Sequence, residues 1–189
     1  MTTDTPARQR AEMFLPTEQD PRENGPSLAD ERTTLAEFLR RQRETLKLKC
    51  AGLDAEQLAR RAVEPSTLSL LGLVRHLAEV ERIWFRRCLA GLDMPSLYRS
   101  AEAPDGDFDG ALPHAAAVTQ AWDAWHAEVA FADHFIAGAP DLEVTGPDPN
   151  KDGRRISLRE ILVHMVEEYA RHNGHADLLR ERVDGHIGM

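Results

Sequence analysis

Four long stretches of the sequence repeat apolar residues at the three- and four-residue spacing of an α-helix. They cover residues 27–50, 66 or 69 to 91, 114–136 and 157–183. Capping sequences support two of the beginnings, because Ser27 opens an SLAD sequence and Ser157 stands three residues before Glu160. The sequence offers one candidate strand, the short fragment EVTG at residues 143–146. The pattern therefore predicts an all-α fold, a four-helix bundle.

The first 26 residues have a different character. They contain four prolines, at positions 6, 16, 21 and 26, and little periodicity. We expect residues 1–26 to form an extended N-terminal arm in front of a helical domain at residues 27–189. Two alternatives stay open for this arm. It is either a loose tail or a segment that packs over the domain or a partner subunit through Met13, Phe14 and Leu15.

Two connections between the predicted long helices stand out. Residues 54–63 favour a short helical turn before Pro65. Residues 93–113 are rich in proline, glycine and aspartate and show no regular period. Connections of this length often form lids or binding loops, although a plain solvated crossover fits the pattern equally well.

Composition and charge exclude several classes of function. The chain has 189 residues with 42% hydrophobic and 29% charged residues, which is the balance of one ordinary globular domain. Its formal net charge of -9, without a cluster of lysine and arginine, argues against a nucleic-acid partner. No signal peptide and no apolar run long enough for a membrane span is recognisable, so we expect a cytoplasmic protein.

The two cysteines, Cys50 and Cys88, lack the CxxC spacing of zinc ribbons and redox pairs. A cysteine outside such a pattern is most often a small buried apolar residue. We therefore predict that both are buried free thiols.

The last predicted helix carries a polar stripe. At about 100° per residue, the side chains of His164, Glu168, His172 and His175 fall within about 80° of one another. The stripe lies beside the apolar face of the same helix, so its groups lose contact with water. Buried histidine and glutamate are costly without partners, so something should satisfy them.

His76, in the second predicted helix, lies on the same face as its apolar neighbours and should point inward. A lone inward histidine is more often a hydrogen-bonded core residue than a metal ligand. Glu168 and His172, however, are four residues apart and can hold one ion together. With His76 they would form a three-ligand metal site with an open position, which is typical of catalytic metals. A buried polar network is the alternative that these residues leave open.

The runs LSLLGLVRHLAEVERIWFRR and SLREILVHMVEEYARHNGHADLLRE resemble the DinB-like superfamily of bacterial four-helix proteins, specifically its actinobacterial mini-circle branch. The likeness covers about residues 27–186. It implies a DinB-type bundle in which a divalent metal is held by His76, Glu168 and His172. Glu168 stands where many relatives have a histidine. Zinc is the metal that we expect first, with nickel, iron, manganese or cobalt as alternatives.

The same His, Glu, His arrangement is similar to that of the mycothiol-dependent maleylpyruvate isomerase, a zinc protein of this superfamily. That isomerase has an additional C-terminal domain, so its substrate is not carried over. The resemblance implies a low-molecular-weight thiol such as mycothiol as cosubstrate and an electrophile as its partner. We expect an S-transferase or isomerase in which the metal favours the thiolate. His175 and His164 are the candidate catalytic residues, which would orient a ligand or move a proton.

Several competing hypotheses stay open. Two histidines and one carboxylate also describe non-haem iron oxygenases, although those usually have a β-barrel. A metal-dependent hydrolase would use the same three ligands. A non-enzymatic metal-binding helical protein, or a stripe that only stabilises a homodimer, is the remaining alternative. For His164 and His175 the alternative to a catalytic role is a helix-edge histidine that binds water.

Overall fold

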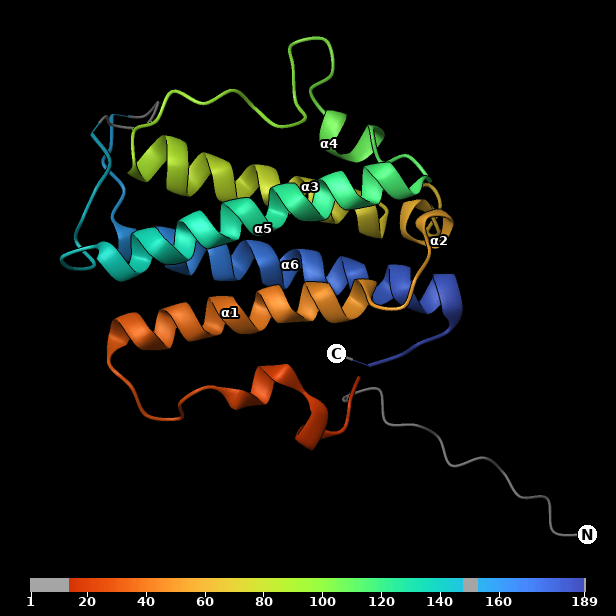
Figure 1. Ribbon diagram of the computed structural model, residues 1–189, viewed down its shortest axis with the longest axis horizontal. Helices are drawn as coiled ribbons and strands as arrows, with labels where there is room; N and C mark the ends of the chain where they lie inside the picture. The colour runs from red at the N-terminus through yellow and green to blue at the C-terminus, as the bar shows by residue number, and fades with distance from the viewer. Residues whose placement is uncertain (1–13, 148–152, 189) are drawn as a thin grey trace, which may run out of the picture.

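The computed structural model describes residues 14–147 and 153–188, and this part of the chain is an all-α bundle (Figure 1). The long segments are α1 (Glu31–Cys50), α3 (Leu70–Glu81) with its π-helical continuation η3 (Arg82–Leu89), α5 (Ala115–Gly138) and α6 (Leu158–Asp184). The shorter elements are η1 (Thr17–Gln19), η2 (Pro21–Asn24), α2 (Ala55–Ala59) and α4 (Gly106–Asp109). The predicted four-helix bundle is confirmed. The EVTG fragment contributes only an isolated bridge, between Thr145 and Ser157.

The first long helix begins later than the sequence pattern predicts. The Asp30 carboxylate accepts a hydrogen bond from the backbone N–H of Thr33 at 2.8 Å, so α1 starts at Glu31. The predicted start at Ser27 is therefore wrong. Both residues are good N-caps, but only the one directly before the helix can reach a free N–H of its first turn.

The caps of the helices that carry the polar residues agree with the prediction. Ser69 caps α3 by accepting from the N–H of Gly72 at 3.1 Å. Ser157 caps α6 by accepting from the N–H of Glu160 at 3.2 Å. Gly185, in the left-handed conformation, ends α6 with a hydrogen bond to a carbonyl of the last turn. The stripe from His164 to His175 therefore lies well inside α6.

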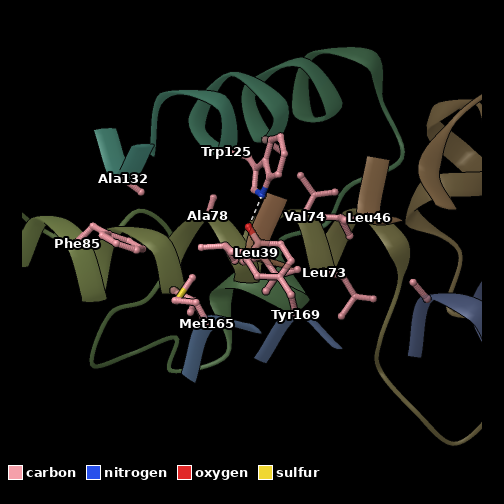
Figure 2. Packing of buried hydrophobic residues seen from close by; sticks show 14 of the residues in the cluster. Leu39, Leu46, Leu73, Val74, Ala78, Phe85, Trp125, Ala132, Met165 and Tyr169 are labelled. Atoms are coloured by element: carbon pink, nitrogen blue, oxygen red, sulfur yellow. Dashed lines mark hydrogen bonds between the residues drawn. The ribbon is translucent and has the colours of Figure 1, made fainter. Parts of the chain in front are cut away.

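The long helices pack chiefly as two pairs, α1 with α6 and α3 with α5, while α3 also contacts α6 (Figure 1). Apolar side chains of all four meet in one cluster, shown in Figure 2 by Leu39, Leu73, Trp125 and Met165. Among residues 14–147 and 153–188, every helix is too short or too polar to span a bilayer.

The described part of the N-terminal arm packs over the chain's own helices. The Phe14 ring lies 4.4 Å from the ammonium nitrogen of Lys49 and 5.6 Å from the guanidinium carbon of Arg180. Arg40 of α1 donates a hydrogen bond to the first carbonyl of η2 at 3.0 Å. The packing alternative is thus confirmed for Phe14, whereas Met13 lies outside the described residues.

The connections are confirmed only in part. The short helical turn expected in residues 54–63 is α2, which a capping box formed by Asp54 and Gln57 begins. Residues 93–113 contain a helical turn, α4, that the sequence pattern did not predict. This turn contacts α3, so the connection is not a plain solvated crossover.

A buried polar network joins all four long helices in the middle of the core. Arg43 of α1 donates two hydrogen bonds of 2.8 Å to the carboxylate of Glu81 in α3. The Tyr169 hydroxyl of α6 donates to the same carboxylate at 2.8 Å, and the Trp125 indole of α5 donates to that hydroxyl at 2.8 Å (Figure 2). All four side chains are buried. Burying an ion pair is costly, but here the carboxylate keeps charged and neutral donors.

The Arg43→Leu substitution should destabilise the fold by about 3–5 kcal/mol, because it leaves the Glu81 charge buried without its cation. Urea denaturation of the two proteins measures this difference. Lys47→Ala is the control, since Lys47 forms an exposed pair with Glu44 and its loss should cost less than about 1 kcal/mol. Equal stability of the Arg43→Leu variant and the wild type would contradict the prediction.

Candidate metal centre

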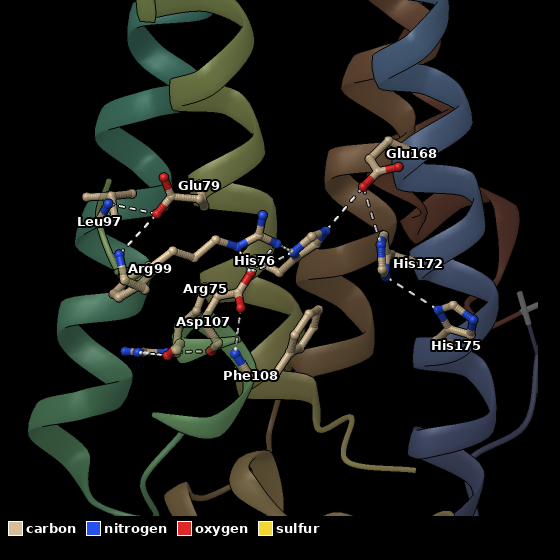
Figure 3. A network of polar contacts seen from close by, with 12 residues as sticks. Arg75, His76, Glu79, Leu97, Arg99, Asp107, Phe108, Glu168, His172 and His175 are labelled. Carbon is tan, nitrogen blue, oxygen red and sulfur yellow. Dashed lines mark hydrogen bonds and ion pairs between the residues drawn. The ribbon is translucent and has the colours of Figure 1, made fainter. Parts of the chain in front are cut away.

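α3 and α6 bring His76, Glu168 and His172 together. One ligand atom from each side chain lies within 4.8 Å of the other two. Glu168 Oε1 is 3.1 Å from His76 Nε2 and 3.4 Å from His172 Nε2, so the carboxylate stands between the two imidazoles (Figure 3). The ring centroids of the two histidines are 4.6 Å apart. The structure thus places the three residues that the sequence singled out in one cluster.

The electrostatics of this cluster favour an anionic glutamate. Hydrogen bonds from His172 and His76 lower the pKa of Glu168 well below its usual range, against the opposing effect of burial. Burial lowers the pKa of His76, but hydrogen bonds with Asp107 and Glu168 outweigh it and raise the pKa above its usual value. Both histidines are buried and Glu168 is half-buried. At neutral pH the cluster therefore presents an ionised carboxylate between two histidine side chains.

The donor set fits a divalent metal. Imidazole nitrogens and a carboxylate oxygen are ligands of zinc and of several other first-row metals. The three donors come from two helices that the core network holds in place, so the cluster does not depend on a flexible loop. Three protein donors leave room for a further ligand, which is typical of a catalytic site.

Asp107 of α4 is a site residue that the sequence analysis missed. Its Oδ2 atom lies 2.8 Å from His76 Nδ1 and accepts a hydrogen bond of 2.9 Å from Arg99 Nε. The carboxylate is fully buried, and although burial raises its pKa, the bonds from His76 and Arg99 lower it to about 2. A metal-binding histidine generally donates its other N–H to an acceptor, so the aspartates of the long connection were the signal in the sequence for such a partner of His76.

The other two histidines of the stripe lie in different surroundings. His175 Nδ1 is 3.4 Å from His172 Nδ1, and burial together with the charges of His172 and Arg171 lowers the pKa of His175. The His164 ring packs edge-on against Trp84 with its centroid 4.7 Å away, and it is not one of the three clustered residues. The structure thus brings His175 to the cluster and leaves His164 beside η3.

Comparison with known proteins identifies the fold and the family of the chain. In structure, the chain is similar to a conserved protein from Enterococcus faecalis, with a TM-score of 0.58 and 16% sequence identity over 84% of this chain and 99% of that one. This likeness shows the fold alone. No curated protein matches the chain. The family model of the mycothiol S-transferases matches residues 34–185, a range that includes α3, α6 and the connection with Asp107. The chain therefore belongs to the mycothiol S-transferase family, of the DinB-like type that the sequence motifs indicated.

Proposed function

We propose that the protein is a metal-dependent S-transferase that joins the sulfur of a small thiol, mycothiol, to an electrophilic carbon. The observation that carries the proposal is the cluster of His76, Glu168 and His172 in a chain of the mycothiol S-transferase family. These three residues would hold the metal, with zinc as the first candidate and nickel, iron, manganese or cobalt as alternatives. A bound divalent cation would favour the thiolate over the thiol of an incoming ligand.

The chain's own cysteines are unsuited to act as the nucleophile. Cys50 is buried, and burial raises its pKa to about 12. Cys88 is half-buried, less than the sequence analysis predicted, and burial raises its pKa as well. Neither belongs to the cluster. The nucleophilic sulfur of the proposed reaction therefore comes from a separate thiol.

His175 is the residue that we propose as proton acceptor. Its lowered pKa keeps it neutral at pH 7, and it is half-buried beside His172. A neutral imidazole in this place can take the thiol proton as the S–H bond breaks. The sulfur then forms a bond to the electrophilic carbon, whose leaving group departs, or adds reversibly in an isomerisation. His164, one turn before Glu168, is the second candidate for moving a proton.

The protonation states give a direct check of the site in the metal-free protein. We expect His76 to titrate above 6.5 and His175 below 6.5, because carboxylates surround the first and burial beside His172 disfavours the charge of the second. Protonated His76 stabilises the fold fully below about pH 6.5, and this contribution is lost as the pH rises through its folded-state pKa. Two-dimensional NMR of the imidazole nitrogens measures both values, and the reverse order would contradict the assignment.

The His172→Ala substitution should abolish metal retention while leaving the helical content intact. A bundle of this size has enough core to fold without a metal. Elemental analysis and circular dichroism of the purified variant measure the two properties. The control is His134→Ala, because His134 is exposed on α5 and should leave the metal content unchanged. Metal bound equally well by the His172→Ala variant would exclude the proposed ligand set.

Mycothiol added to the metal-loaded protein should release a proton near pH 7, because a free thiol is mostly protonated and a thiolate ligand is not. Calorimetry in two buffers of different ionisation enthalpy counts this proton. An S-methylated mycothiol serves as the control, since it has no proton to lose. If mycothiol produced no heat and released no proton, the hydrolase or the non-enzymatic alternative would be favoured.

A further inference from the structure

The connection between η3 and α5, residues 90–114, is attached to α3 next to His76. Arg75 directly precedes His76, and its guanidinium donates to the carbonyl of Asp107 at 2.8 Å and to that of Gly106 at 2.8 Å. Arg75 is buried, and its guanidinium carbon lies 3.8 Å from the centroid of the Tyr98 ring. The backbone of α4 is therefore held by the helical turn that carries His76.

A second attachment, Glu79, lies four residues after Arg75 along α3. Glu79 is fully buried, and its Oε2 atom accepts from the N–H groups of Leu97 and Tyr98 at 2.7 and 3.0 Å (Figure 3). Arg75 and Glu79 thus hold two parts of the connection to the same face of α3. Neither side chain belongs to the clustered residues, yet together they determine where the Asp107 carboxylate lies.

The hydrogen bonds of Asp107 determine the orientation of the His76 ring. A carboxylate only accepts, so the 2.8 Å contact between Asp107 Oδ2 and His76 Nδ1 requires the proton on Nδ1. Arg99 Nη2 lies 3.1 Å from the same Nδ1 but only 2.8 Å from Asp107 Oδ2. The Arg99 guanidinium therefore forms its ion pair with the Asp107 carboxylate. Nε2 lies 3.1 Å from Glu168 Oε1 and donates to that carboxylate in the metal-free protein. Because Asp107 keeps the proton on Nδ1, Nε2 is the nitrogen whose proton a metal would replace.

Phe108 restricts the same ring from one side. Its ring is stacked on His76 with centroids 4.8 Å apart and an angle of 22° between the planes. Its backbone N–H donates to Asp107 Oδ1 at 3.1 Å. The tautomer and the plane of His76 are therefore both held by consecutive residues of α4.

We propose that Asp107, held by Arg99, is a positioning residue that keeps the His76 imidazole in the tautomer and orientation that a metal needs. The inference rests on the proposed function, because it concerns a ligand of that metal. It makes the connection at residues 90–114 part of the metal centre. Partners of this kind typically change metal affinity by about 10–100-fold when they are altered.

The Asp107→Asn substitution separates hydrogen bonding from packing, because the two side chains have nearly the same shape. An asparagine has one acceptor and one donor group, so it cannot accept from Phe108 on one side and from Arg99 and His76 on the other. With its amide nitrogen facing His76, Nδ1 would become an acceptor and Nε2 would carry the proton. With its amide oxygen facing His76, the side chain would keep the proton on Nδ1 but set its amide nitrogen against the Phe108 N–H, which loses the bond that holds the carboxylate in place.

Competition with a chromophoric chelator for zinc tests the proposal. We expect about a 10–100-fold loss of affinity for Asp107→Asn and about a tenfold loss for Arg99→Leu. The cobalt-substituted proteins should also differ in their visible absorption bands, which a purely structural role would leave unchanged. Asp109→Asn is the matched control, because Asp109 lies in the same helical turn but forms its ion pair with the exposed Arg61, at 2.9 Å. Affinities of Asp107→Asn and Arg99→Leu equal to the wild type would overturn the proposal.

NMR of the imidazole nitrogens of His76 in the metal-free protein gives a measurement that needs no metal. The shifts should change in Asp107→Asn and stay constant in Asp109→Asn, and unchanged shifts in both would overturn the positioning role. If the wild type binds no metal, the proposed function fails, while these shifts still decide the role of Asp107. If Asp107→Asn does not fold, the Arg99→Leu variant decides. Arg99 is 34% exposed, so its replacement spares the core.

Discussion

The rest of this bundle depends on the ion pair and hydrogen bonds that the buried carboxylate of Glu81 forms. Glu81 binds Arg43 of α1 and the Tyr169 hydroxyl of α6, and Tyr169 in turn binds α5. Glu81 follows His76 by five residues, about 7.5 Å along the helix, and Tyr169 directly follows Glu168. The network therefore fixes the register of α3 against α6 next to the cluster. A slip of α3 against α6 would break the buried hydrogen bond between Tyr169 and Glu81 and would separate His76 from Glu168 and His172.

The features that the sequence predicted correctly are those that depend on residues close together in the chain. Glu168 and His172 are four residues apart, so their common face follows from helical geometry, and the apolar neighbours of His76 indicate its inward direction. Asp107 could not be found in this way. Its contact with His76 spans 31 residues through a connection without periodicity, and it depends on attachments to α3 that only the folded chain reveals.

The two remaining histidines illustrate a second limit of sequence patterns. A helical wheel places His164 and His175 in nearly the same direction but ignores their position along the axis. His164 lies about 12 Å from His172 along α6, at the level of Trp84, whereas His175 is one turn from it. The structure therefore places His164 and His175 in different surroundings, although the sequence analysis treated them alike.

The glutamate at position 168 also bears on the proposed chemistry. Two neutral imidazoles and one carboxylate carry a single negative charge, so a divalent cation and one thiolate would complete a neutral set. Neutrality is favourable in a half-buried place, because an uncompensated charge there costs free energy. The ion pair of Asp107 with Arg99, on the other side of His76, is neutral as well. Under the proposed function, a site with three histidines would hold the same thiolate with one excess positive charge. The carboxylate therefore suits a centre that must bind the thiolate and still release it to an electrophile.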